Sequence, residues 1–284
     1  MNRIGIALLF GNHVVAQQVG TLGSTFGPAP GPTPPGLAPA TAVVSGVLYC
    51  PSAGDMNSEH GTVVFANGGW TMLGDARVSS KTSWNLLGGF IEWDMNTSAV
   101  APAVNTNLYT VSPKQPNCGE ACYCDIQKSQ SGKASCMELD LTENNGRCEF
   151  ATTLHTYETD GTPSNRNCDR WGCAATQKIP ASGAFHMKAA FSANGTVTVS
   201  MDGVVNPAYS PVPSASSNGV VVETMKSLGA AIESSQWFGW VPAASDCPSG
   251  DASRLASSFV TVTNVKVSGT VVQGPTPDKC TKPY

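Results

Sequence analysis

Residues 136–146 read CMELDLTENNG and place three carboxylates, Glu138, Asp140 and Glu143, within six positions of a chain that is otherwise poor in charge. Leucines alternate with the first two acids, which is the period-two pattern of a strand that buries one face. Glu138 and Asp140 therefore share the polar face of the predicted strand. Glu143 falls out of step, and one extra residue at Leu141–Thr142, a β-bulge, would return it to that face.

Acids gathered on one face suggest acid–base chemistry. With one bulged residue, Glu138 and Glu143 are four strand rises apart, about 13 Å between Cα atoms, and side chains leaning inward could bring their carboxyl groups to about 5 Å. This separation suits a retaining glycosidase, in which one carboxylate attacks the sugar and the other protonates the leaving oxygen. Asp140 would hold the carboxylate of Glu138 in place. The alternative is an acidic strand face that is only solvated.

The composition of the 284 residues favours an all-β protein in one domain. Charged residues make up 13% of the chain, while 29 glycines and 20 prolines supply turns. The net charge of −4 provides no basic stripe for nucleic acid and no polybasic membrane anchor, so neither partner is expected. The sequence indicates no cofactor, and the protein is expected to be a monomer.

Strand-like segments recur along the chain between turn residues, which predicts two antiparallel sheets packed as a β-sandwich. Besides the acidic strand, they cover residues 43–49, 62–66, 70–73, 83–95, 107–111, 149–157, 185–191, 196–201, 204–205, 219–223, 235–240 and 259–267. Asn194-Gly195 predicts a tight hairpin between two of them, because this pair favours the positive φ angles of such a turn. No helix longer than two turns is expected, and a single helical turn at 225–228 stays open.

The chain divides by composition into four parts. Residues 1–16, with Arg3 ahead of a short apolar run, are predicted to be a signal peptide. Residues 17–42 form a Pro/Gly-rich arm, residues 43–272 the sandwich, and residues 273–284 a polar tail.

Ten cysteines fit disulfides in a secreted protein, and the sequons at Asn96 and Asn194 fit a glycoprotein. The group Cys118, Cys122 and Cys124 lacks the paired spacing and histidine partners of a zinc site, so disulfides are preferred and no metal is expected.

Several stretches resemble glycoside hydrolase family 7, the fungal cellobiohydrolases and endoglucanases. Residues 138–143 have its E-x-D-x-x-E pattern, residues 123–127 (YCDIQ) its Y-C-D-x-Q segment, and residues 105–109 (NTNLY) its N-G-A-L-Y-F strand. Shorter likenesses lie at residues 17–21, 86–95 and 259–267. The acidic motif is shared with family 16 glucanases on the same sandwich, and the Y-C-D-x-Q match favours family 7.

The resemblance implies a concanavalin A-like jelly roll with an open substrate cleft, and a secreted, retaining endo-β-glucanase that acts on β-1,4 or mixed-linkage glucan. Glu138 would be the nucleophile, Asp140 its partner and Glu143 the acid/base. The residues that would line the subsites are Asn105, Tyr123, Asp125, Gln127 and His155. The chain is shorter than typical members and has Thr142 close to where a Trp is usual. A carbohydrate-binding protein without catalysis, or a family 16-like β-1,3(4)-glucanase, stays open as an alternative.

Other residues near this motif are weighed individually. His155 lies on the strand that follows the acidic one and is expected near Glu143, where it would bond the acid/base or a sugar hydroxyl; the alternative is a structural role. Trp240 is preferred over Trp237 for stacking on a sugar ring, with core packing as the alternative. Arg170 would bind sugar hydroxyls or lie in a solvated loop.

A disulfide between Cys124 and Cys136 would fasten the Y-C-D-x-Q segment to the acidic strand, and Cys168 with Cys173 could close a second, small loop.

Overall fold

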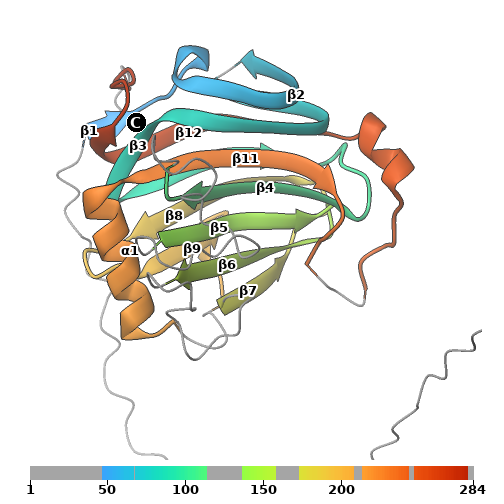
Figure 1. Cartoon of the computed structure of the whole chain (residues 1–284). Helices are drawn as coiled ribbons and strands as arrows, with labels where there is room; N and C mark the ends of the chain where they lie inside the picture. Colours follow the sequence, from blue (N-terminus) through green and yellow to red (C-terminus); the bar gives the residue numbers. More distant parts are fainter. Residues whose placement is uncertain are drawn as a thin grey trace, which may run out of the picture. The chain divides into compact units, whose positions relative to one another are not determined.

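The structure is a computed structural model that describes residues 47–66, 68–113, 136–157, 173–207, 213–242 and 246–280. These residues form mainly strands, drawn in Figure 1. The strands are β1 (Val47–Tyr49), β2 (Met56–Ala66), β3 (Gly69–Asn96), β4 (Val104–Val111), β5 (Cys136–Asn145), β6 (Glu149–Tyr157), β7 (Cys173–Lys178), β8 (Ala184–Phe191), β9 (Val197–Met201), β10 (Val204–Val205), β11 (Ala230–Phe238) and β12 (Phe259–Gln273). The helices are α1 (Ala215–Ser227) and the short 3₁₀ helices η1 (Ala53–Asp55) and η4 (Ala252–Ser257).

The strands join into one hydrogen-bonded sheet that curls into two layers. Its order is β10-β9-β8-β3-β11-β4-β5-β6-β7, and β2 and β12 also pair with β3. The long strand β3 belongs to both layers, because residues 90–96 pair with β8 whereas residues 76–84 pair with β11. The separate strands predicted at 70–73 and 83–95 are therefore parts of one continuous strand. The predicted two-layer β-sandwich is confirmed.

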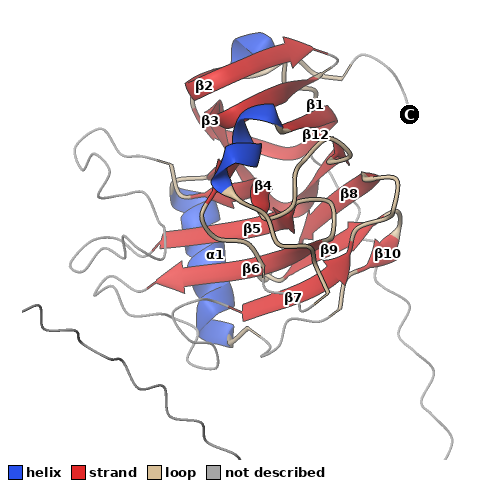
Figure 2. Ribbon diagram, turned by 90° about the vertical axis from the view of Figure 1, so that its right-hand side faces the viewer, coloured by secondary structure: helices blue, strands red, loops and turns tan. Residues whose placement is uncertain are grey.

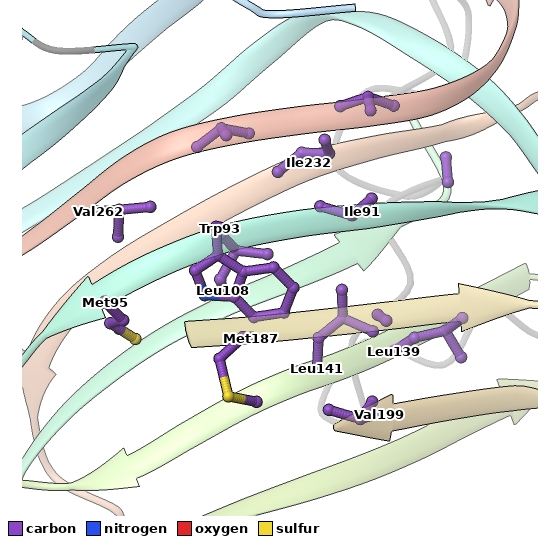
Figure 3. Packing of buried hydrophobic residues seen from close by; sticks show 14 of the residues in the cluster. Ile91, Trp93, Met95, Leu108, Leu139, Leu141, Met187, Val199, Ile232 and Val262 are labelled. Carbon is purple, nitrogen blue, oxygen red and sulfur yellow. The ribbon is translucent and has the colours of Figure 1, made fainter. Parts of the chain in front are cut away.

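The hydrophobic core lies between the layers, as Figure 3 shows. Leu139 and Leu141 of β5 belong to the same buried cluster as Met187 of β8 and Val199 of β9, and Trp93 of β3 is fully buried among them. Each of these side chains alternates with a residue that faces outward. The core therefore fixes which face of β5 is left for polar residues.

The predicted hairpin is confirmed as β8 and β9. Phe191 pairs with Val197, and the backbone nitrogen of Ser192 donates to the carbonyl of Thr196 across the turn. Gly195 has a φ of 83°, in the left-handed region that glycine adopts without steric cost.

Two predictions are wrong: that no helix exceeds two turns, and that residues 219–223 form a strand. Residues 219–223 lie in the 13-residue helix α1. Ser214 caps the helix, its side chain accepting a hydrogen bond from the backbone nitrogen of Ser217. Val221 and Met225 are fully buried, and α1 packs against β3, β5 and β6 (Figure 2). Valines favour strands by propensity, but burial of this helix face decides the conformation.

Disulfides are confirmed within the described residues. Cys50 is bonded to Cys280 and Cys148 to Cys247, while Cys136 is also disulfide-bonded. The predicted partner of Cys136 and the predicted loop that begins at Cys168 lie outside the described residues, as do the predicted signal peptide and the whole Pro/Gly-rich arm. Among the helices of the described residues, none has the length and apolar character needed to cross a membrane.

Candidate active site

Strand β5 contains the predicted bulge. On the β4 side, Tyr109 lies opposite Asp140, whereas its neighbour Leu108 lies opposite Thr142, so β5 has one residue more than β4 at this point. The pairing with β6 shifts between Asp140 and Glu143 in the same way. The bulge returns Glu143 to the face that carries the other two acids.

The three acids occupy the face of β5 that points away from the core. Leu139 and Leu141 between them are buried in the core, with 2% and 0% of their surface exposed. Glu138 is 8% and Asp140 6% exposed, whereas Glu143 is partly exposed. Carboxylates with so little contact to water need partners from the protein.

Asp140 has an imidazole partner. Nε2 of His155 lies 3.2 Å from Oδ2 of Asp140, and both side chains are 9% exposed. His155 pairs in register with Glu138, whereas the residue of β6 opposite Glu143 is Ala151, so His155 lies beside Glu138 and Asp140 rather than beside Glu143 as expected. The imidazole can hold the Asp140 carboxylate in a fixed orientation next to the nucleophile candidate.

Glu143 is held from the other side, by β4. Nδ2 of Asn105 donates to Oε1 of Glu143 at 3.3 Å and to the backbone carbonyl of Trp240 at 3.1 Å. Asn105 therefore links the acid/base candidate to the segment that carries Trp240. The side chain of Trp240 is 47% exposed, while Trp237, which pairs with Asn105, is partly buried. Because β11 ends at Phe238, strand alternation no longer fixes the direction of Trp240.

Two contacts between β4 and β11 were not anticipated from the sequence. The hydroxyl of Tyr109 donates to Oε2 of Glu233 at 2.7 Å, and Nδ2 of Asn107 donates to Oγ of Ser235 at 2.9 Å. Tyr109 belongs to the NTNLY stretch, which was a signal for this strand. Glu233 had no such signal, because its partner lies 124 residues away in the sequence.

The remaining predicted site residues, Tyr123, Asp125, Gln127 and Arg170, lie outside the described residues, and the open cleft stays a prediction.

Outside the candidate active site, one cluster among the described side chains has the spacing of a metal site. Its residues already have other partners, which argues against metal binding. Glu149, Asp246 and Cys247 lie close together, but Cys247 forms a disulfide. Nζ of Lys178 lies 3.2 Å from Glu149 and 2.6 Å from Asp246. An ammonium group already occupies the position between the two carboxylates.

No protein-family model matches the sequence, and no curated protein matches it significantly. Similar solved structures include an endocellulase of Humicola insolens (TM-score 0.48, 15% identity, covering 72% of this chain and 76% of that one). A family 7 cellobiohydrolase of Daphnia pulex has a TM-score of 0.49 at 14% identity, covering 72% and 78%. Porphyranase B of Zobellia galactanivorans has a TM-score of 0.42 at 10% identity, covering 78% and 87%. The family that the sequence resembles is thus found among the similar structures, but similarity at this level carries no conclusion about activity.

Proposed function

We propose that this chain is a secreted, retaining glycoside hydrolase that cleaves β-1,4 or mixed-linkage glucan within the polymer. The observation that carries the proposal is the bulge in β5, which brings Glu143 to the face of Glu138 and Asp140. Without the extra residue, Glu143 would point into the core. A nucleophile and an acid on one polar face are what a double displacement requires.

In the first step, the carboxylate of Glu138 attacks the anomeric carbon and forms a glycosyl ester. The bond to the leaving oxygen breaks, and protonated Glu143 transfers its proton to that oxygen. In the second step, Glu143, now ionised, removes a proton from water. The water oxygen attacks the same carbon, and Glu138 leaves as a carboxylate. Two inversions retain the configuration.

The surrounding residues support these roles. The imidazole of His155 holds Asp140, which lies two positions from Glu138 on the same face. Asn105 fixes the carboxyl group of Glu143 by donating to one oxygen. Catalytic groups have to be held within about 0.5 Å of their working geometry, which is the function of such supporting bonds.

The sequence resemblance adds sugar-binding roles for Asn105, Tyr123, Asp125, Gln127, His155, Arg170 and Trp240. Secretion is supported by the disulfides Cys50–Cys280 and Cys148–Cys247, since such bonds persist in oxidising compartments.

Two departures from the family pattern motivate the alternative of a carbohydrate-binding protein: Thr142 stands close to where a Trp is usual, and the chain is shorter than typical members. Thr142 is fully buried, and its hydroxyl donates to the sulfur of Met95 at 3.9 Å. A side chain on this face of β5 packs in the core. The missing Trp is therefore weak support for a loss of catalysis.

The decisive experiment measures hydrolysis and stereochemistry together. Purified protein is incubated with barley β-glucan, carboxymethyl-cellulose, laminarin and xyloglucan, and released reducing ends are counted. We expect release from the first two substrates, with a rapid fall in viscosity because cleavage is internal. Proton NMR of the first product should show the β-anomer. Retention of polymer without release would favour the binding protein, and an α-anomer would rule out the double displacement.

A further inference from the structure

Strand β11 contributes a fourth acid to the polar face, and this acid is buried like Glu138 and Asp140. Glu233 is 6% exposed, and its Oε2 accepts a hydrogen bond of 2.7 Å from the hydroxyl of Tyr109. Burying a carboxylate is costly unless it is hydrogen-bonded, and the bond from Tyr109 offsets part of that cost for Glu233. The catalytic steps described above do not use it.

Glu233 lies in one row with the catalytic strand. Asp140 of β5 is opposite Tyr109 of β4, and Tyr109 is opposite Glu233 of β11. Two strand spacings separate Asp140 from Glu233, which corresponds to about 10 Å. The next row repeats the arrangement, since Asn107 lies opposite Glu143 and bonds Ser235. Polar side chains therefore continue from β5 over β4 to β11.

The direction of this row matches the direction in which a glucan would lie. Glu138 and Glu143 are both on β5, so the line between them follows the strand. Nucleophile and acid flank the scissile bond, and a chain bound between them runs across the strands. On one side it passes over β4 and then over β11. A sugar unit beyond the one at the reacting bond then meets Glu233.

We infer that Glu233 is a specificity-determining residue that binds hydroxyl groups of a sugar unit remote from the scissile bond, with Tyr109 fixing its carboxylate. This inference rests on the proposed function. A site built to bond hydroxyls loses binding when either partner is removed, because the buried polar group is left without that bond. Only substrates long enough to reach β11 make the contact.

The test compares cello-oligosaccharides of two to six units with wild type, Glu233→Gln and Glu233→Ala. Glu233→Gln keeps the shape and one acceptor oxygen for Tyr109, so it separates recognition from folding. Glu92→Gln is the matched control, since Glu92 is a partly buried acid of the other layer. We expect kcat/KM of Glu233→Ala to fall about 10-fold or more on the longest substrates, mainly through KM, with little change on the shortest. Glu233→Gln should show the same trend to a smaller extent.

A loss that is equal for all lengths, or no loss in either variant, would overturn the inference. If wild type hydrolyses none of these sugars, the proposed function fails, and the inference is then decided by calorimetric binding of the same series. Affinity that depends on both length and Glu233 would support it, and affinity independent of Glu233 would contradict it. Thermal unfolding of each variant verifies the fold.

Discussion

Two strands of this protein carry the same tripeptide pattern, an acid, a large apolar residue and a second acid. In β3 it is Glu92-Trp93-Asp94, and in β5 it is Glu138-Leu139-Asp140. Trp93 and Leu139 are buried in the same core between the layers. Both acid pairs therefore point away from that core, one from each layer.

The surroundings of the two pairs differ. Glu92 lies 2.9 Å from Lys266 and 3.7 Å from Lys188, and Asp94 lies 2.7 Å from His186. Glu92 is 18% and Asp94 40% exposed, so water and the neighbouring basic side chains offset the charge of these acids.

In β5 the acids are nearly buried and are joined by a third through the bulge, with an imidazole and an amide as partners. The acid–apolar–acid pattern determines that the two acids lie on the face of the strand opposite the core. The neighbouring strands decide whether that face is an ion-pair network or a reaction site.

Substituting the first acid of each pair, Glu138 or Glu92, should change kcat to very different extents. Glu138→Gln should lower kcat by about 10⁴-fold or more, because it removes the nucleophile's charge at nearly constant shape. Glu92→Gln should leave kcat unchanged. Steady-state rates on barley β-glucan measure both, and normal turnover by folded Glu138→Gln would assign the nucleophile elsewhere.

The aspartates should differ less. Asp140→Asn weakens the contact with His155 and loosens the geometry beside Glu138, so kcat should fall about 100-fold. Asp94→Asn should retain full activity. The same assay with a matched thermal unfolding curve separates the two outcomes. Equal activity of both variants would remove Asp140 from the catalytic group.

A third comparison concerns the amides that hold an acid. Nδ2 of Asn105 donates to Glu143, and Nδ2 of Asn264 donates to Asp94 at 2.6 Å. A hydrogen bond to a charged group is worth about 1.5–3 kcal/mol, so Asn105→Ala should lower kcat/KM about 10-fold or somewhat more. Asn264→Ala should change only stability. A drop in activity for Asn264→Ala would show that the layers are coupled.

The smallest effect is a dependence of stability on pH. Partial burial raises the pKa of Asp94, but hydrogen bonds from Asn264 and His186 and the charges of His186 and Lys266 outweigh it and hold the pKa below its ordinary value. A depressed pKa stabilises the fold above the unfolded value of about 3.9, and this stabilisation is lost as pH falls through the folded value.

Asp94→Asn should therefore lower the free energy of unfolding at pH 6 by at most about 1 kcal/mol, since the site is solvent-screened. The difference should vanish near pH 2, as urea unfolding at both pH values would show. A difference that persists at pH 2 would contradict this explanation.

The features that depend on neighbours along the chain could be predicted from the amino-acid sequence. The alternation of side chains along a strand predicted that Glu138 and Asp140 share one face. The odd spacing from Asp140 to Glu143 predicted the bulge that returns Glu143 to this face. Asn194-Gly195 predicted the β8–β9 turn. These are local properties of backbone geometry, and the period of two is the same in any strand.

The other features depend on contacts between segments that are distant in the sequence. Residues 219–223 became helix because Val221 and its neighbours found a buried surface, which outweighs their strand propensity. His155 contacts Asp140 because the register of β6 against β5 places it opposite Glu138, two residues from Asp140. Glu233 reached Tyr109 across 124 residues because β11 lies beside β4. Strand order follows from how whole layers pack, and a pattern within one strand does not encode which distant strand will lie beside it.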